Sequence, residues 1–334
     1  MSDNQPPYTI TSRILSLVAE IIEELGSIKG IKVLSIPPSL RRGNRIKTIQ
    51  ASLAIEGNTL SLEQVTDVIA GKRVLGLPRE IQEVKNAFAV YERLGKLSQY
   101  SIEDMLEAHK TLMYGLIDEA GMFRHGNVGI ARDEDIIHVA PPAGRVYALV
   151  TDLLKWLKET DIHPLVASSI FHYEFEFIHP FADGNGRMGR LWQTLILSQW
   201  QPIFALLPVE TVVCDRQQDY YNVLRTSDES ADGTLFAEFM LASILQSLQE
   251  LSSETHQVTD QVTPQVEKLL GVVVGEMTRV ELQECLGLKD RVSFKERYLN
   301  PAITHGFIEM TVPDKPNSRL QKYRLTNKGK SFAK

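Results

Sequence analysis

Apolar residues recur at helical spacing through most of the first 260 residues, and this periodicity restricts the fold more than any other feature of the sequence. It predicts an all-α body with helices over the segments 14–25, 81–94, 102–113, 146–159, 163–178 and 234–251. One interruption, residues 126–144, holds short β-branched stretches around a charged turn and ends with two prolines. A small β-hairpin is therefore predicted there.

The C-terminal part of the chain has a different pattern. Residues 252–264 are polar, lack helical periodicity and end at a proline, which predicts a linker at 252–262. Three helices are predicted after it, the second opening with a capping box of Thr278 and Glu281 and the third ending near Pro301. Two strands follow, at 307–312 and 320–325, so a winged helix is predicted at 263–334.

Composition limits the class of protein. The 334 residues are 43% hydrophobic and 23% charged, as in an ordinary globular protein. The two cysteines, Cys214 and Cys285, lie far apart, which excludes a disulfide framework and a thiolate metal site built from this chain alone. The first residues do not resemble a secretory signal, and no apolar run approaches the ~20 residues of a membrane span. We expect a soluble, cytoplasmic protein that does not contact a membrane.

The net charge of −6 is unevenly distributed. Residues 263–334 carry 13 Lys and Arg against 8 Asp and Glu, whereas the other 262 residues carry 23 against 34. A basic C-terminal domain on an acidic body indicates different partners for the two parts.

The densest set of chemically active residues is "HPFADGNGRMGR", from His179 to Arg190. Its three glycines match the spacing of the dinucleotide-binding fingerprint, but neither a buried strand before them nor an acid at the end of a following strand accompanies them. A Walker loop is absent from the sequence, and a zinc site using His179 and Asp183 lacks a third ligand. A plain tight turn before a helix, with solvated arginines, is the remaining alternative.

Together these residues can bind a phosphorylated ligand. The glycines can direct backbone N–H groups into one concavity, and a helix that starts near Arg187 adds its positive end. Arg187 and Arg190 can each grip a phosphate, and Asp183 can hold a Mg²⁺ ion that bridges two phosphates. His179 lies next to them, with a side chain suited to taking a proton from an attacking hydroxyl.

The segment resembles the signature HxFx[DE]GNGRxxR of the Fic (filamentation induced by cAMP) family, and it matches at every defined position. The resemblance implies the Fic helical fold and transfer of AMP from ATP to a Ser, Thr or Tyr hydroxyl of a target protein or of the chain itself. It implies that His179 is the general base, that Phe181 seats the loop in the core and that Asp183 binds Mg²⁺. The presence of the Gly-Asn-Gly triplet favours nucleotidyl over phosphoryl transfer. The ATP-binding set implied comprises Gly184, Asn185, Gly186, Arg187, Met188, Gly189, Arg190, Tyr220, Tyr221 and Asp228.

A second segment, "SLAIEGN", resembles the inhibitory motif [ST]xxxE[GN] of the family, with Ser52, Glu56 and Gly57 at its defined positions. It lies N-terminal to the catalytic motif, as in the second class of the family. Apolar residues at 46, 49 and 53 predict a helix that ends at Gly57. By resemblance, Glu56 forms a salt bridge with Arg190 and occupies the space that the γ-phosphate needs. Low basal transfer is expected.

The resemblance extends over residues 15–251 and assigns further parts. It implies an N-terminal region with the inhibitory helix at 1–100 and a catalytic domain at 101–251. The hairpin is similar to the Fic flap, which binds a target segment as an added strand. Its candidate residues are Ile136, Ile137, His138 and Val139.

The sequence does not decide which partners the chain has beyond ATP and a target protein. DNA is one candidate for the winged helix, and a docking protein is the alternative. A homodimer is a further expectation. The same motifs also fit a nucleotide-sensing regulator, or removal of AMP by the same site with Glu56 positioning a water. The basic residues expected to contact DNA are Arg291, Lys295, Arg297, Lys315, Arg319, Lys322 and Arg324.

Overall fold

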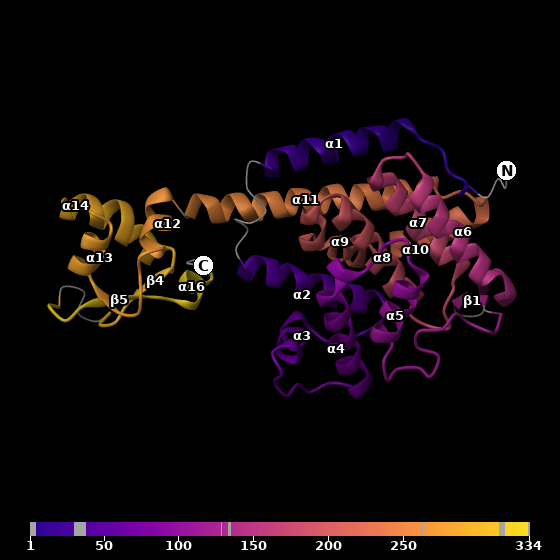
Figure 1. Cartoon of the computed structure of the whole chain (residues 1–334), viewed down its shortest axis with the longest axis horizontal. Helices are drawn as coiled ribbons and strands as arrows, with labels where there is room; N and C mark the ends of the chain where they lie inside the picture. The colour runs from indigo at the N-terminus through magenta and orange to yellow at the C-terminus, as the bar shows by residue number, and fades with distance from the viewer. Residues whose placement is uncertain are drawn as a thin grey trace. The chain divides into compact units, whose positions relative to one another are not determined.

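The computed structural model describes residues 5–29, 38–127, 129–132, 135–261, 263–313 and 318–332. The chain divides into two compact units (Figure 1). The N-terminal unit comprises Met1–Gly30 and Asn44–Gln249, and the C-terminal unit comprises Ile31–Gly43 and Glu250–Lys334.

The predicted all-α character of the first 260 residues is confirmed. Each segment with helical apolar spacing is a helix, and further helices connect them. The helices are α1 (Ser12–Lys29), α2 (Pro38–Ile55), α3 (Leu62–Ile69), α4 (Pro78–Glu92), α5 (Ile102–Leu112), α6 (Val146–Glu159), α7 (Pro164–Ile178), α8 (Asn185–Trp200), α9 (Val209–Asp215), α10 (Gln217–Ser230) and α11 (Thr234–Gln261).

Helices α7 and α8 form the centre of the N-terminal unit and pack closely on each other. Ile170, Phe171 and Phe175 on α7 are fully buried, as are Leu191 and Trp192 on α8. Burying such large apolar side chains contributes about 1.5–3 kcal/mol each. The motif that starts at His179 therefore connects two buried helices that pack on each other.

Helix α2 ends as the sequence predicts. Its apolar residues Ile46, Ile49 and Leu53 are buried. Gly57 follows in a left-handed conformation with φ 89°, and its N–H donates to the carbonyl oxygen of Ala54. Glycine adopts this conformation without steric cost, which fixes where the helix stops. Glu56 consequently lies immediately after the last helical residue.

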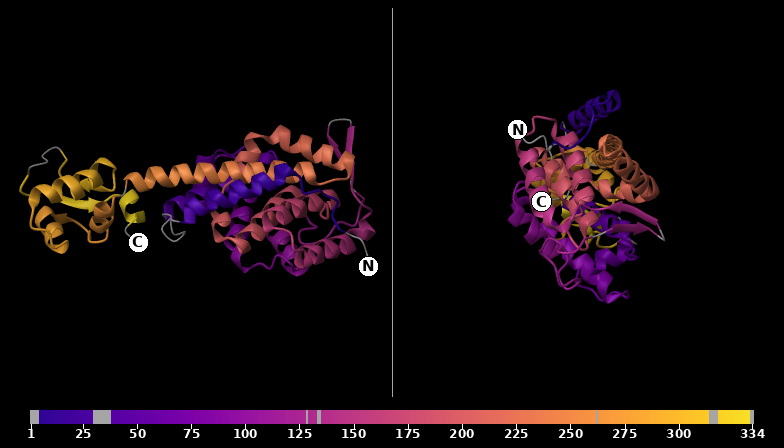
Figure 2. Two further views of the ribbon diagram at one scale, coloured as in Figure 1. Left: turned by 90° about the horizontal axis from the view of Figure 1, so that it is seen from above. Right: turned by 90° about the vertical axis from the view of Figure 1, so that its right-hand side faces the viewer.

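The predicted hairpin is present at the edge of the helices of this unit, as both views of Figure 2 show. Strand β1 (Gly129–Arg132) pairs antiparallel with β2 (Asp135–Val139), with a register shift between Ile130 and Ala131. The backbone of the predicted flap residues 136–139 forms most of β2.

The C-terminal unit contains short helices and a small sheet, in the order predicted for a winged helix. The antiparallel sheet has the strand order β3-β5-β4, and residues such as Leu282, Phe294 and Phe307 fill the core. The elements are α12 (Pro264–Leu270), β3 (Met277–Thr278), α13 (Arg279–Cys285), α14 (Arg291–Phe294), a π-helical turn (Lys295–Leu299), α15 (Asn300–Thr304), β4 (Ile308–Met310), β5 (Lys322–Leu325) and α16 (Asn327–Phe332).

Three local features of this unit bear on the sequence predictions. The capping box of Thr278 and Glu281 is present, as predicted. Helical structure continues through Pro301 to Thr304, whereas the sequence predicts an end near the proline. Pro301 lies inside this continuous helical run, directly after the π-helical turn, in which the N–H of Asn300 donates to the carbonyl oxygen of Lys295. Strand β3 and helix α16 were not predicted.

Residues 252–261 of the predicted linker are helical although their sequence lacks helical periodicity, because α11 continues through them to Gln261. The segment holds neither glycine nor proline, so nothing in it breaks a helix that is already formed. Pro264 is the first such residue, and Thr263 caps the next helix with its side chain. None of the helices in the described residues is long and apolar enough to cross a membrane.

Candidate active site

The turn between α7 and α8 carries the start of the motif. His179 follows the last residue of α7 in a left-handed conformation, with φ 49° and ψ 61°, and its N–H donates to the carbonyl oxygen of Phe175. This conformation is uncommon for a residue with a side chain, so the surroundings must hold it. The imidazole is half-buried. Gly184, with φ 86°, then caps the N-terminus of α8.

Phe181 and Asn185 stabilise this turn through burial and hydrogen bonds. Phe181 is fully buried, as the sequence predicts, and its ring stacks on that of His109 at 3.7 Å. The side chain of Asn185 accepts a hydrogen bond from the N–H of Phe181 and donates one to its carbonyl oxygen, each at 2.9 Å. This amide group therefore shapes the loop, and its predicted phosphate contact stays a prediction.

His109 on α5 is a site residue that the sequence analysis missed. Its Nδ1 accepts a hydrogen bond from the N–H of Gly121 at 2.9 Å, so its Nε2 carries the hydrogen and donates to the carbonyl oxygen of Asp183 at 3.0 Å. Burial lowers the pKa of this imidazole to about 4. His109 is thus a neutral support for the loop. Its position on the buried face of an amphipathic helix was the available signal.

Helix α8 begins at Asn185, in the middle of the predicted phosphate-binding residues, and phosphate binding there stays a prediction. The first N–H groups of a helix have no acceptor within the helix and lie at its positive end. A Cβ atom on Gly186 would overlap the carboxylate of Glu56 and lie 3.1 Å from Nη1 of Arg190. The Glu56 carboxylate therefore lies against this helix end.

Arg190 is almost fully buried and contacts the end of α2. Its Nη2 lies 2.7 Å from Oε1 of Glu56, and its Nε donates to Oγ of Ser52 at 3.1 Å. Burial works against the charge, but the facing Glu56 carboxylate raises the pKa of the guanidinium. The structure thus brings together Ser52, Glu56 and Arg190 as the sequence predicts.

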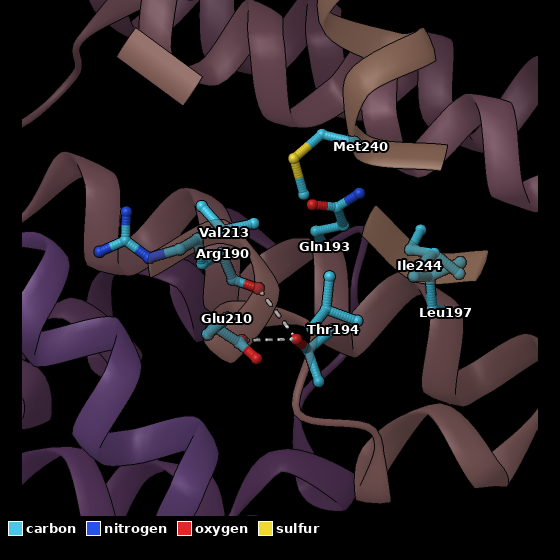
Figure 3. Close-up of a pocket in the computed structure, with 9 residues that line it drawn as sticks. Arg190, Gln193, Thr194, Leu197, Glu210, Val213, Met240 and Ile244 are labelled. Atoms are coloured by element: carbon cyan, nitrogen blue, oxygen red, sulfur yellow. Dashed lines mark hydrogen bonds between the residues drawn. The ribbon is translucent and has the colours of Figure 1, made fainter. Parts of the chain in front are cut away.

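One guanidinium nitrogen of Arg190 is not used in these contacts. Within the described residues, its buried Nη1 has no hydrogen-bond partner. Figure 3 shows a small cavity next to Arg190, lined by residues such as Thr194, Glu210 and Met240. The guanidinium of Arg190 points away from this cavity. The cavity measures about 10 Å³, room for one water and far too small for a nucleotide. Burial raises the pKa of Glu210 at this cavity to about 7.

Arg187 and Asp183 belong to a second ion-pair network. Nη2 of Arg187 lies 2.9 Å from Oδ1 of Asp183, and its Nη1 lies 3.3 Å from Oε1 of Glu83 on α4. Arg79, one turn before Glu83, reaches Oδ2 of Asp183 at 3.2 Å. Glu83 also accepts a hydrogen bond from the side chain of Asn58, two residues after Glu56. Sequence analysis found Asp183 and Arg187 but missed both α4 residues, because no local pattern marks them.

Two predicted ligand contacts do not face the site. Met188 is fully buried and its N–H donates to the carbonyl oxygen of Gly184, so it is a core residue. Tyr220 is buried among aromatic residues, with its hydroxyl 3.3 Å from Nε2 of His172. Gly189 packs against the side chain of His172, where any larger residue would collide.

The remaining adenine-side predictions have a mixed outcome. The hydroxyl of Tyr221 donates to the carbonyl oxygen of Ile55 at 3.0 Å, and Gln217 donates to the same atom at 2.7 Å. These bonds attach α10 to the end of α2, next to Glu56. Burial, together with the nearby Asp228 carboxylate, raises the pKa of Glu174 to about 7. A contact of Tyr221 or Asp228 with adenine stays a prediction.

In the C-terminal unit, acidic residues offset part of the predicted basic surface. Nε of Arg324 lies 2.7 Å from Oε1 of Glu309, and its Nη1 lies 3.3 Å from Oε1 of Glu276. Lys315 lies outside the described residues. Binding of DNA by this unit stays a prediction.

Comparison with known proteins gives consistent matches over both units. Residues 99–197 match the sequence model of the Fic/DOC family, and residues 264–326 match that of the C-terminal domain of Fic-like proteins. The protein adenylyltransferase Fic of Culex quinquefasciatus is 26% identical over 264 residues, which are 73% of this chain and 49% of that protein. The corresponding protein of Aedes aegypti is 30% identical over 201 residues, 55% of this chain and 37% of that protein. The chain thus spans about half or less of the length of these relatives.

A solved structure matches almost the whole chain. The crystal structure of a Fic family protein from Desulfovibrio desulfuricans G20 has 57% sequence identity and a TM-score of 0.76. The match covers 97% of this chain and 98% of that one. At this identity and coverage, the chain belongs to the Fic family.

Proposed function

We propose that the chain is a protein adenylyltransferase that transfers AMP from ATP to a hydroxyl group and that Glu56 holds it at low activity. One observation carries the proposal: His179, the N-terminus of α8 and two arginines converge at one turn, and the Glu56 carboxylate lies on Arg190 beside that helix end. The names of the relatives from Culex quinquefasciatus and Aedes aegypti support the same activity.

The reaction assigns a distinct task to each group. The hydroxyl oxygen of the target attacks the α-phosphorus of ATP, a new O–P bond forms, and the bond to the oxygen that bridges to the β-phosphate breaks. His179 takes the hydroxyl proton, and pyrophosphate leaves with the bond electrons. The helix N-terminus and Arg187 hold the negatively charged phosphates in line for this attack.

Asp183 fits a Mg²⁺ ion bound together with nucleotide. Its carboxylate is 38% exposed at the mouth of the site, and none of the described residues form a cluster of three or more metal ligands. Mg²⁺ in nucleotide sites commonly takes one or two carboxylates, with phosphate oxygens and waters as its other ligands. The ion would neutralise charge on the phosphates. To bind it, Asp183 must loosen its ion pairs with Arg79 and Arg187.

Glu56 inhibits in this proposal because it competes with a phosphate for one guanidinium. The carboxylate and the γ-phosphate are both anions, and the guanidinium fork of Arg190 binds either. With Glu56 in place, ATP can still contact Arg187 and the helix N-terminus, but its outer phosphate is displaced. The α-phosphorus is then out of line for attack, and small misplacements of this kind lower rates by up to about 100-fold.

The test measures self-modification with Mg²⁺ and ATP labelled on the α- or the γ-phosphate. We expect Glu56→Gly to raise incorporation of the α-label by about 10- to 100-fold over wild type, and the γ-label to stay unincorporated. The double variant Glu56→Gly/His179→Ala is the control and is expected to incorporate the α-label at least about 100-fold more slowly than Glu56→Gly while it still binds ATP. Incorporation of the γ-label would identify phosphoryl transfer instead, and no incorporation by Glu56→Gly would refute the proposal.

A further inference from the structure

Arg124 is a buried arginine in the segment between α5 and the hairpin, outside the motifs described above. Its side chain donates to four backbone carbonyl oxygens: Nε to His179 at 2.7 Å, Nη1 to Gly126 at 2.9 Å, and Nη2 to Pro141 at 2.5 Å and Ile178 at 3.3 Å. Its own N–H donates to the carbonyl oxygen of Pro180 at 2.9 Å. Only 3% of the residue is exposed, and in the described part of the chain no carboxylate pairs with it.

The position of these acceptors links two parts of the site. Ile178 and His179 end α7, where the last carbonyl groups of a helix lack partners and its negative end attracts a cation. Gly126 precedes β1 and Pro141 follows β2, so the same guanidinium holds both ends of the hairpin. The left-handed backbone of His179 needs support of this kind.

Only arginine suits this set of acceptors. Its planar group presents five N–H donors in a fixed fork, whereas a lysine ammonium has three donors at a single point. A buried charge is tolerated when hydrogen bonds satisfy it, and here backbone oxygens do so. An arginine whose side chain donates to backbone oxygens of two segments far apart in sequence sets the geometry of both.

We propose that Arg124 is a positioning residue that fixes the catalytic turn and the flap relative to each other, so that a target segment on β2 presents its hydroxyl to His179. The proposal rests on the proposed function for its kinetic consequence. In the described residues the side chain of Arg124 hydrogen-bonds to backbone and not to Arg187 or Arg190, so we expect its replacement to change ATP affinity little.

The kinetic experiment uses Glu56→Gly as the parent and measures ATP affinity by calorimetry and the rate of self-modification at saturating ATP. Arg124→Lys is expected to lower the rate by about 100-fold and to leave the affinity within about twofold. Arg145→Ala removes an exposed arginine after the hairpin and serves as the matched control, with no change expected. A parallel loss of ATP affinity, or retention of half the rate by Arg124→Lys, would overturn the positioning role.

Hydrogen exchange provides a readout that does not need activity. In the wild-type background, Arg124→Lys is expected to speed amide exchange in both the hairpin and residues 178–184, whereas Arg145→Ala changes neither. Faster exchange in only one segment, or in neither, would refute the link. An inactive parent with coupled exchange would refute the proposed function and leave the link standing. Arg124→Gln replaces the lysine variant in both measurements if that variant fails to fold.

Discussion

The two ends of the motif 179–190 are held in different ways. At the first end, Arg124 and His109 donate hydrogen bonds to backbone carbonyl oxygens of the turn. At the second end, the acidic side chains of Glu83 and Glu56 pair with Arg187 and Arg190. A nucleotide cannot replace bonds to backbone oxygens, but its phosphates can replace carboxylates on arginine. The first end is therefore built as a fixed support, and the second as a set of contacts that a ligand can exchange.

The largest expected effect lies at the fixed end. In the Glu56→Gly background, His179→Ala should lower AMP transfer by about 10²–10⁴-fold, the usual contribution of a general base. ATP affinity, measured by calorimetry, should stay within about twofold, because the proposed phosphate contacts lie at the other end. A proportional loss of affinity would show that His179 belongs to the nucleotide contacts.

Lower pH should weaken the fixed end through His109. Its folded-state pKa of about 4 lies below the ordinary value of 6.5, so the unfolded chain takes up the proton first. The free energy of unfolding should therefore fall as pH drops from about 6.5 to about 4, by about 3 kcal/mol from this group. Urea denaturation at several pH values measures it, and His109→Gln should flatten this part of the profile. An unchanged profile in the variant would contradict the neutral state assigned to His109.

Removing the Glu56 carboxylate from Arg190 should lower the free energy of unfolding, and bound ATP should restore part of it. Glu56→Gly leaves a buried guanidinium without its carboxylate, and we expect a loss of about 1–3 kcal/mol, since Glu56 itself is partly exposed. ATP with Mg²⁺ should then raise the melting temperature of the variant more than that of wild type. Equal shifts in thermal melts would show that the phosphates do not reach Arg190.

The smallest effect is expected from Glu83, which pairs with Arg187. Glu83→Gln should raise AMP transfer in the wild-type background by roughly threefold, the scale of a partly screened ion pair. The gain is limited because Asp183 still pairs with Arg187. Labelled-ATP incorporation measures it, with Glu92→Gln on the exposed side of α4 as the control. If Glu83→Gln raised transfer as much as Glu56→Gly, the ion pair on Arg187 would inhibit as strongly as the one on Arg190, which would contradict the special role proposed for Glu56.

Site residues that belong to a short sequence motif could be predicted. Site residues that come from distant segments of the chain could not. The motif at 179–190 was enough to predict His179, Asp183 and both arginines. The short pattern at 52–57 was enough to predict Glu56, the ion-pair partner of Arg190. His109, Glu83 and Arg124 reach the site from other elements, so no spacing in the sequence connects them to it.

The fold shows the same division. Apolar periodicity located the helices of the N-terminal unit, because burial of one face determines that spacing. It failed at residues 252–261, where a polar helix continues without an apolar stripe. It also could not show that Met188 and Tyr220 lie in the core, since their neighbours in space come from distant segments.

The partner of Arg190 in the presence of nucleotide is the most direct test. Crystal structures of wild type and Glu56→Gly, each with Mg²⁺ and a non-hydrolysable ATP analogue, would locate it. We expect Arg190 to stay on Glu56 in wild type and, in the variant, to lie about 2.7–2.9 Å from a γ-phosphate oxygen. A γ-phosphate bound away from Arg190 in the variant would contradict the exchange of partners on which the proposed inhibition depends.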